Sequence, residues 1–325
     1  MKTRLVTICL FLFASQVFAE ECKGTDVSKW DNCHGILVNP NILKYSGEFK
    51  NGKANGQGIL IYDEGTTYIG EFKNDLFHGQ LEANYSNGTK YVGEFKKDKP
   101  EGVGVFKSSG GSIIYFGEYK KGKSHGLGTF TYENGSRYFG EFKDGKPNGF
   151  GASFLPDGGG FFGKYVDGAP SGIGYIRTPK NEFDFGEWKG YEITRRIKKC
   201  DDAISHCIGI IKNSKNDMYY GELKNKNING IGTTIFASPK DIYNGEHRNN
   251  SIEGFGLMSF EDGRIYFGQY VDNGQEGRGM MIFTNGGFFI GEWKNDAPSS
   301  GTMTFDDGTK YIGELKNGRQ NGFGI

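Results

Sequence analysis

A six-residue block, aromatic-x-Gly-Glu-aromatic-Lys, recurs along most of this chain and limits what the chain can fold into. Successive copies are 22 to 24 residues apart, except for one interval of 35 residues. The glycines of the twelve copies are Gly47, Gly70, Gly93, Gly117, Gly140, Gly163, Gly186, Gly221, Gly245, Gly268, Gly291 and Gly313. A fixed period of this length is typical of an array of similar structural units stacked on one another.

Each copy has a second block, Gly-x-Gly, nine residues further on, and a turn pair such as Asn134-Gly135 or Asp262-Gly263 follows it. Asn-Gly and Asp-Gly between alternating runs are the strongest short-range signal for a β-hairpin. The 54 glycines disfavour helices, because each costs about 1 kcal/mol in a helix relative to Ala. The 27 Phe and 18 Tyr disfavour disorder. We therefore expect one β-hairpin per unit in an all-β fold.

Alternation along a strand assigns the side chains to faces. In residues 138–143, Tyr138, Gly140 and Phe142 share one face, whereas Glu141 and Lys143 lie on the other. A glycine inside a strand often marks a place where another group approaches the backbone closely. We expect aromatic rings to lie in these glycine slots, so that aromatic-glycine packing replaces a two-layer core. The Glu and Lys side chains are expected to form rows of mixed charge on the surface.

The run at residues 45–58, Tyr-Ser-Gly-Glu-Phe-Lys-Asn-Gly-Lys-Ala-Asn-Gly-Gln-Gly, and its recurrences closely resemble the MORN repeat, over about residues 45–325. The resemblance implies an elongated, twisted antiparallel sheet of consecutive β-hairpins, about twelve units long. It also implies a scaffold or an accessory module beside an enzyme, and association with phospholipid or membrane-proximal proteins is commonly proposed for the family. Exported bacterial members, which this chain resembles, are generally of unknown function.

Residues 1–19 have the features of an export signal. Lys2 and Arg4 precede an apolar run at 5–14, and Val17-Phe18-Ala19 places small residues where a signal peptidase reads them. We predict cleavage after Ala19 and a periplasmic or secreted mature protein. An amino-terminal membrane anchor is the alternative, but the apolar run is short for spanning a bilayer, which needs about 20 residues.

Four cysteines remain after removal of this signal, and an even number in an exported chain suggests disulfides. Three pairings are formally possible, and we expect the two local ones, Cys22 with Cys33 and Cys200 with Cys207. A metal site formed by the second pair with Asp201, Asp202 and His206 is the alternative, but the paired C-x-x-C spacing of zinc sites is missing.

Counting by repeat positions divides the chain after the signal into a cysteine-containing cap at 20–44 and arrays at 45–190 and 207–325. Cys33 and Cys207 occupy equivalent repeat positions, and each has a second cysteine upstream. Residues 191–206 are therefore either a loop insertion closed by its own disulfide or a second cap that starts a new array.

No catalytic set stands out from this periodic background, so we predict a protein that is not an enzyme and has no cofactor or metal. Residues 117–124 match the phosphate-loop pattern G-x-x-x-x-G-K-[ST]. That loop needs a helix after it, whereas glycine-rich strand sequence follows Ser124. We interpret the match as a by-product of the repeat.

Without Lys2 and Arg4, the net charge falls from 0 to −2, which predicts no long-range attraction to nucleic acid. The leading hypothesis is an exported scaffold that associates with a protein or envelope partner. It pairs with a second copy or a partner through the C-terminal strand edge, since open edges are usually covered.

The alternative hypothesis is a phospholipid- or polysaccharide-binding module. It would use exposed Tyr and Phe for stacking and the basic cluster Arg195, Arg196, Lys198 and Lys199 for anionic groups. The repeat aromatics at the first position of the block, of the kind expected to pack over glycine, are Tyr45, Tyr68, Tyr91, Tyr115, Tyr138, Tyr219, Tyr243, Tyr266 and Tyr311.

Overall fold

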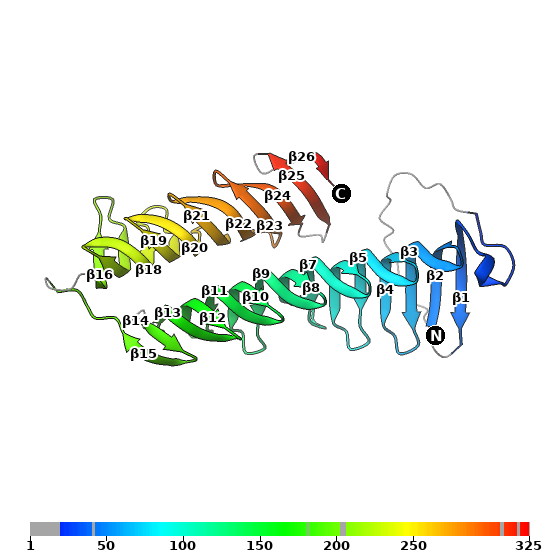
Figure 1. Cartoon of the computed structure of the whole chain (residues 1–325), viewed down its shortest axis with the longest axis horizontal. Coiled ribbons are helices and arrows are strands. Elements are labelled where there is room, and N and C mark those ends of the chain that lie inside the picture. The colour runs from blue at the N-terminus through cyan, green and yellow to red at the C-terminus, as the bar shows by residue number, and fades with distance from the viewer. Residues whose placement is uncertain are drawn as a thin grey trace, which may run out of the picture. The chain divides into compact units, whose positions relative to one another are not determined.

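A computed structural model describes residues 20–40, 43–180, 182–201, 206–305, 309–316 and 319–324 (Figure 1). The predicted export signal at 1–19 lies outside these residues. The described chain divides into two compact units, with the boundary between Ser86 and Asn87.

The first unit contains a short 3-10 helix and five strands, each paired antiparallel with the next. The elements are η1 (Val27–Lys29), β1 (Cys33–Asn39), β2 (Leu43–Lys50), β3 (Lys53–Tyr62), β4 (Thr67–Lys73) and β5 (Leu76–Asn84). After η1, the Trp30 ring packs edge-on against Phe49, with 4.8 Å between ring centroids, and is itself buried. Trp30 therefore covers the apolar end of this unit.

In the second unit, β6 to β15 pair in chain order, and β16 to β26 form a separate sheet in the same way. The strands are β6 (Lys90–Lys96), β7 (Lys99–Lys107), β8 (Ile113–Lys120), β9 (Lys123–Thr131), β10 (Arg137–Lys143), β11 (Lys146–Phe154), β12 (Gly160–Val166), β13 (Ala169–Arg177), β14 (Phe183–Lys189), β15 (Glu192–Arg196), β16 (His206–Lys212), β17 (Met218–Lys224), β18 (Asn227–Ile235), β19 (Ile242–Arg248), β20 (Ser251–Ser259), β21 (Ile265–Val271), β22 (Gly274–Ile282), β23 (Phe288–Lys294), β24 (Ala297–Thr304), β25 (Lys310–Lys316) and β26 (Arg319–Gly324). The predicted all-β fold of consecutive antiparallel hairpins in open sheets is confirmed.

The repeat tyrosines lie over the glycines, as the sequence predicts. The Tyr138 ring covers Gly140 on its own strand and Gly151 on the next. Its hydroxyl donates a hydrogen bond to the Glu141 carbonyl oxygen at 3.0 Å. The same bond to the residue three positions on recurs for Tyr45, Tyr91, Tyr115, Tyr219, Tyr243, Tyr266 and Tyr311.

The aromatic residue after each Glu connects neighbouring tyrosines. Phe142 packs edge-to-face against Tyr138, at 5.1 Å between ring centroids, and against Tyr115, at 5.2 Å. Tyr243 and Tyr266 make the same contacts with Tyr270 in the other sheet of the second unit, both in T-shaped geometry. We call these rings the aromatic ladder and the side of each sheet that carries them the ladder face.

The repeat glutamates are not simply rows of surface charge, which corrects the sequence prediction. The pairing register shifts between Gly140 and Phe142, and a Glu141 carboxylate oxygen accepts a hydrogen bond from the Phe150 N–H at 2.7 Å. Glu118, Glu246 and Gln269 make the equivalent bond nine residues on. These side chains satisfy a backbone donor beside the bulge, and a buried donor without a partner costs about 1–3 kcal/mol. Side-chain alternation could not reveal this because it takes no account of bulges.

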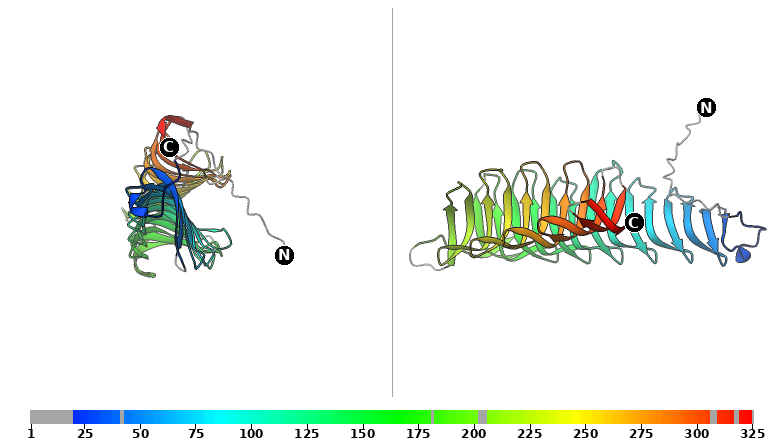
Figure 2. Two further views of the ribbon diagram at one scale, coloured as in Figure 1. Left: turned by 90° about the vertical axis from the view of Figure 1, so that its right-hand side faces the viewer. Right: turned by 90° about the horizontal axis from the view of Figure 1, so that it is seen from above.

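The second unit contains a two-layer core, so the expectation that aromatic-glycine packing replaces one is wrong there. Its two sheets face each other with the faces opposite to the ladders (Figures 1 and 2). Phe116 of β8 stacks on Phe288 of β23 at 4.2 Å, and Phe183 of β14 stacks on Tyr220 of β17 at 5.5 Å. The strand order of one sheet therefore runs opposite to that of the other. The core forms because many residues directly before the repeat glycine are large and apolar.

Polar contacts connect the same two sheets. The buried Tyr175 hydroxyl hydrogen-bonds to Thr233 Oγ1 and to Asn244 Oδ1, both at 2.7 Å. Arg278 forms an ion pair with Glu118. The Tyr175 bonds require one alignment of the layers, because any shift leaves the buried hydroxyl unsatisfied, whereas the Arg278–Glu118 pair lies in contact with solvent.

We predict that Gly151→Ala destabilises the second unit by about 1–3 kcal/mol, the usual cost of overpacking, because the added Cβ clashes with the Tyr138 ring. The free energy of unfolding in urea measures this. Gly110→Ala is the control, since the nearest atom to its Cβ would be Ser108 Oγ at 3.8 Å. Equal stability of the two variants would contradict the packing explanation.

Candidate interaction groove

The ladder face of the β16–β26 sheet carries an apolar row beside the tyrosines. The residues that form it lie two and four positions after the second glycine of each Gly-x-Gly block. We call this row the Phe–Met row. Its members are Thr234, Met258, Met281, Met303, Phe236, Phe260, Phe283 and Phe305. Four of the phenylalanine and methionine side chains pack half-buried against the ladder, and Phe305 is 37% exposed.

The matching positions in β6–β15 differ. The four residues four positions after the second glycine there are Ser108, Tyr132, Leu155 and Thr178, whereas the β16–β26 sheet has phenylalanine after Gly232, Gly256, Gly279 and Gly301 and Asn213 after Gly209. A continuous aromatic row is therefore a property of one sheet only. The pattern Gly-x-Gly-x-Met-x-Phe at 254–260 and 277–283 is the sequence signal of this row.

One end of this row opens into a hollow of about 330 Å³. Its apolar wall includes Met218, Phe236, Ile252 and Met258, and its polar wall is formed by Asn213, Asp217, Thr234, His247, Asn250 and Asn273. A mostly apolar concavity with a few fixed polar groups is the usual form of a binding site. We call the hollow and the Phe–Met row together the Phe–Met groove.

Hydrogen bonds to the backbone hold the polar wall in place. Asn250 Oδ1 accepts from the Ile228 N–H, and Asn273 Oδ1 accepts from the Ile252 N–H, both at 2.8 Å. The Ala237 N–H donates to Asp217, and this bond, with one from Asn213, lowers the pKa of the Asp217 carboxyl. The hollow therefore presents a carboxylate at neutral pH.

His247 lies in the floor of the hollow, at the ladder position where most units carry an aromatic residue. It packs edge-on against Tyr219 and Tyr243, at 4.9 and 5.1 Å between ring centroids. Nδ1 donates to the Gly245 carbonyl oxygen at 3.1 Å, and Nε2 accepts from the Thr234 hydroxyl at 3.0 Å. Burial lowers the pKa of the imidazole to about 4, although the bond to Gly245 opposes this. The ring is therefore neutral at physiological pH.

Sequence reasoning did not select His247. The signal was available in Gly245-Glu246-His247, which departs from the Gly-Glu-aromatic pattern. The histidine is compatible with the ladder because a neutral imidazole can pack edge-on like an aromatic ring.

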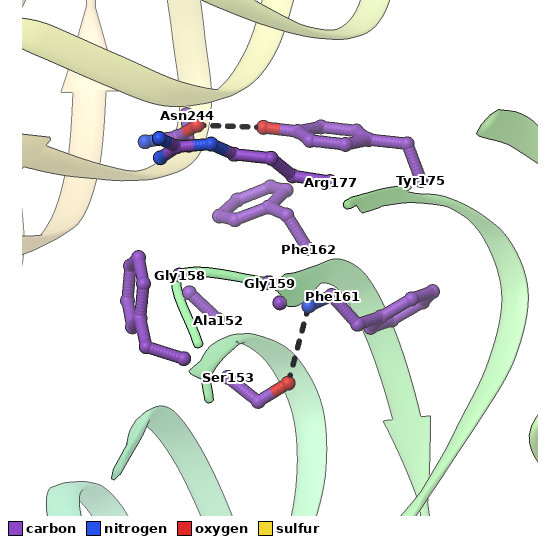
Figure 3. Close-up of a pocket in the computed structure, with 11 residues that line it drawn as sticks. Ala152, Ser153, Gly158, Gly159, Phe161, Phe162, Tyr175, Arg177 and Asn244 are labelled. Carbon is purple, nitrogen blue, oxygen red and sulfur yellow. Dashed lines mark hydrogen bonds between the residues drawn. The ribbon is translucent and has the colours of Figure 1, made fainter. Parts of the chain in front are cut away.

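A second concavity lies between the two sheets of the second unit, lined by Ser153, Phe162, Arg177 and Asn244 among others (Figure 3). Its volume of about 20 Å³ is enough for roughly one water molecule. It is too small to be a ligand site.

The two predicted cysteine pairs form disulfides. The Cα atoms are 5.0 Å apart in Cys22–Cys33 and 4.8 Å apart in Cys200–Cys207. Each disulfide joins the first strand of a sheet to the segment that precedes this strand. An isolated parallel bridge accompanies each one, Glu21 with His34 and Lys199 with Ile208. Among the described residues, no group of three His, Cys, Asp or Glu side chains is placed to hold a metal ion.

The four basic residues at 195–199 do not converge on one site. Arg195 Nε lies 3.2 Å from Glu187 Oε2, and an Arg196 nitrogen lies 2.8 Å from Asp184 Oδ2. Lys198 and Lys199 are exposed. Carboxylates of β14 therefore offset half of the positive charge that the sequence concentrates here.

The repeat tyrosines are not available for stacking on a ligand. Tyr68 is half-buried, and the other eight are buried, with at most 8% of each side chain exposed: Tyr45, Tyr91, Tyr115, Tyr138, Tyr219, Tyr243, Tyr266 and Tyr311. Their rings are occupied by the glycine slots and the ladder.

Comparison with known proteins identifies the repeat. A family model described as MORN repeat matches residues 45–67, 68–80, 91–113, 115–137, 138–160, 266–288, 289–310 and 311–325, which is just over half of the chain. No curated protein matches the sequence.

Solved structures align only loosely. The SAS-4 TCP domain from Drosophila melanogaster, in complex with a proline-rich motif of Ana2, is 11% identical over 57% of this chain and 76% of that chain, with a TM-score of 0.21. A streptogramin B lyase is 12% identical, covering 86% of this chain and 90% of its own, with a TM-score of 0.15. Virginiamycin B lyase from Staphylococcus aureus is 15% identical, covering 87% and 94%, with a TM-score of 0.15. At these TM-scores the alignments carry no conclusion.

No helix in the described part of the chain has both the length and the apolar character needed to cross a bilayer.

We predict that His247 makes folding stability depend on pH. Its folded pKa is about 4, against 6.5 for an ordinary histidine, so the unfolded chain binds a proton first as the pH falls below 6.5. The contribution of a neutral His247 is complete above pH 6.5 and is lost progressively toward pH 4. The loss amounts to about 3 kcal/mol, at 1.36 kcal/mol per pKa unit.

Urea unfolding at several pH values tests this. His247→Phe should remove most of that slope, whereas His34→Gln, at an exposed histidine, should keep it. An unchanged slope in His247→Phe would show that other groups cause the pH dependence.

Proposed function

This chain belongs to the MORN-repeat family, and on that premise we propose that it is a non-enzymatic scaffold that holds a protein partner in the Phe–Met groove. The observation that carries the proposal is the row of half-buried side chains of Phe236, Phe260, Phe283 and Met303, which ends in a hollow of about 330 Å³.

The side chains of the groove favour an apolar protein segment over a charged surface. Methionine is flexible and polarisable, so a Met-lined floor adapts to aliphatic or aromatic side chains. Asp217 and the amides of Asn250 and Asn273 at the hollow can accept or donate hydrogen bonds at its edge. A partner segment with two or three apolar anchors beside a polar or basic residue fits this arrangement.

We also propose that the mature protein works outside the cytoplasm. Two disulfides support this, because such bonds persist mainly in oxidising compartments. The charged and apolar segments within residues 1–19 have the order of an export signal.

A photo-crosslinking residue in place of Phe260 tests the groove in the native cell. We expect a discrete protein adduct from position 260, and none from Tyr132, the exposed matched position in the other sheet. Phe236→Gln combined with Phe283→Gln should reduce that adduct at least tenfold, because the apolar contacts are lost. Equal labelling from both positions would overturn the proposal. A lipid or glycan adduct would also overturn it and would favour the alternative hypothesis.

Intact mass measurement tests export. The mature chain should begin at Glu20 and be lighter than the fully reduced chain by the hydrogens of two disulfides. Ala19→Arg should block processing, because the peptidase needs a small residue at that place. An unprocessed wild-type chain with free thiols would contradict export.

A further inference from the structure

Residues at two repeat positions, directly before the repeat glycine and directly after the second glycine of the Gly-x-Gly block, form the middle of the two-layer core in the second unit. Direct cross-strand partners place these residues in one row across β7 to β14, on the face opposite to the ladder. Val105, Phe116, Phe139, Phe162 and Phe185 in this row are at most 4% exposed. The opposing row includes Leu257, Phe267, Met280 and Ile290, which are equally buried. The core is thus formed by the same repeat positions from both sheets.

The first unit has the same row, and there it is partly exposed. Ile69 occupies the repeat position of Phe116 and is 43% exposed. Ile36, Ile59 and Ile69 lie in one row, with Ser46 between the first two, because Ile36 pairs with Ser46, Ser46 with Ile59, and Ile59 with Ile69. Val38 and Ile61 flank this row and are 58% and 40% exposed. We call Ile36, Val38, Ile59, Ile61 and Ile69 the isoleucine face.

We propose that the isoleucine face binds the isoleucine face of a second copy of this chain. The precedent lies within the molecule, since the second unit covers this repeat face with the same face of another sheet made of the same repeats. A second copy supplies a matching surface in the first unit. Such a pairing is isologous, with identical patches related by a two-fold axis.

The stacking in the second unit fixes the expected arrangement. Strands there face one another in reversed order, as the contacts of β8 with β23 and of β14 with β17 show. The same rule applied to two first units places β3 of one copy on β3 of the other, with Ile59 and Ile61 at the axis. Ile69 of each copy then lies over the β2 side of its partner.

The charges in and beside the face agree with reversed order. Lys44 of β2 pairs with Val38 and with Ile61, so it lies within the isoleucine face, whereas Glu82 of β5 pairs with Ile69 at its margin. With β3 on β3, Lys44 of one copy lies over β4 of the other, one strand away from its Glu82, twice by symmetry. Stacking in the same order would instead bring like charges together, which is unfavourable.

The size of the face predicts a reversible dimer. Four strands about 4.8 Å apart present a face roughly 15–20 Å wide. Two such faces bury on the order of 1,000 Å², which is the lower limit for a specific interface. We therefore expect a dimer that dissociates in the micromolar range.

Sedimentation velocity of the full mature chain, with both disulfides intact, tests the proposal over low to high micromolar concentrations. The wild type should change from monomer to dimer as concentration rises. Ile61→Lys combined with Ile69→Lys should weaken dimerisation at least tenfold, because two charges per copy are then buried. Val271→Lys, at a 50% exposed valine on β21, is the matched control and should dimerise like the wild type.

A charge swap gives a second measurement that does not depend on the apolar variant remaining folded. Lys44→Glu and Glu82→Lys should each weaken the dimer several-fold, and the two together should restore it. A monomeric wild type at every concentration would overturn the proposal. So would undiminished dimerisation of the lysine double variant, which would direct attention to the C-terminal strand edge at β26. The Phe–Met groove variants should dimerise normally, so the test is independent of the proposed function.

Discussion

The structure depends on one contact, a tyrosine ring lying on a strand whose glycines leave the backbone bare. Any Cβ at Gly58, Gly151 or Gly256 would meet the ring of the paired tyrosine. Each such ring buries roughly 150–250 Å² within a single sheet, so a hairpin can shield much of its apolar surface without a second layer. The tyrosine hydroxyl and the repeat glutamate then satisfy backbone groups around the bulge. The glutamate is thus part of the packing unit although it is charged.

Much of this could be predicted from the sequence because it is local. The hairpins, the rings over glycine and the cysteine pairs all depend on residues within about one repeat of each other. The stacking of two sheets could not be predicted, because Glu118 and Arg278 are separated by 160 positions and no periodic signal links them. The position before the repeat glycine also varies from Ser46 to Phe116, so the repeat pattern left its role undefined.

The candidate groove also combines features that the sequence predicts with features that only the structure shows. The ladder predicted the place of an aromatic side chain at position 247, and His247 fills it as a neutral ring with both nitrogens hydrogen-bonded. The Phe–Met row was visible as a pattern, but the half-buried state of Phe236, Phe260 and Phe283 required the structure. Residues four positions after the second glycine in β6–β15 are Ser, Tyr, Leu and Thr. Residues that depart from the repeat pattern are therefore better candidates for a binding site than the repeated residues, because the repeated residues hold the sheet together.

The two faces of each sheet therefore differ in whether they need a second layer to cover them. The ladder face is complete within its own sheet, so any surface it offers, such as the Phe–Met groove, is additional to folding. The opposite face is incomplete wherever its residues are apolar, because a single layer leaves them in contact with water. Phe116 and Phe139 are covered by the second sheet, whereas Ile36 and Ile69 are not. A repeat that can pack against its own kind within one chain can do so between chains, and the sequence before each glycine decides where that happens.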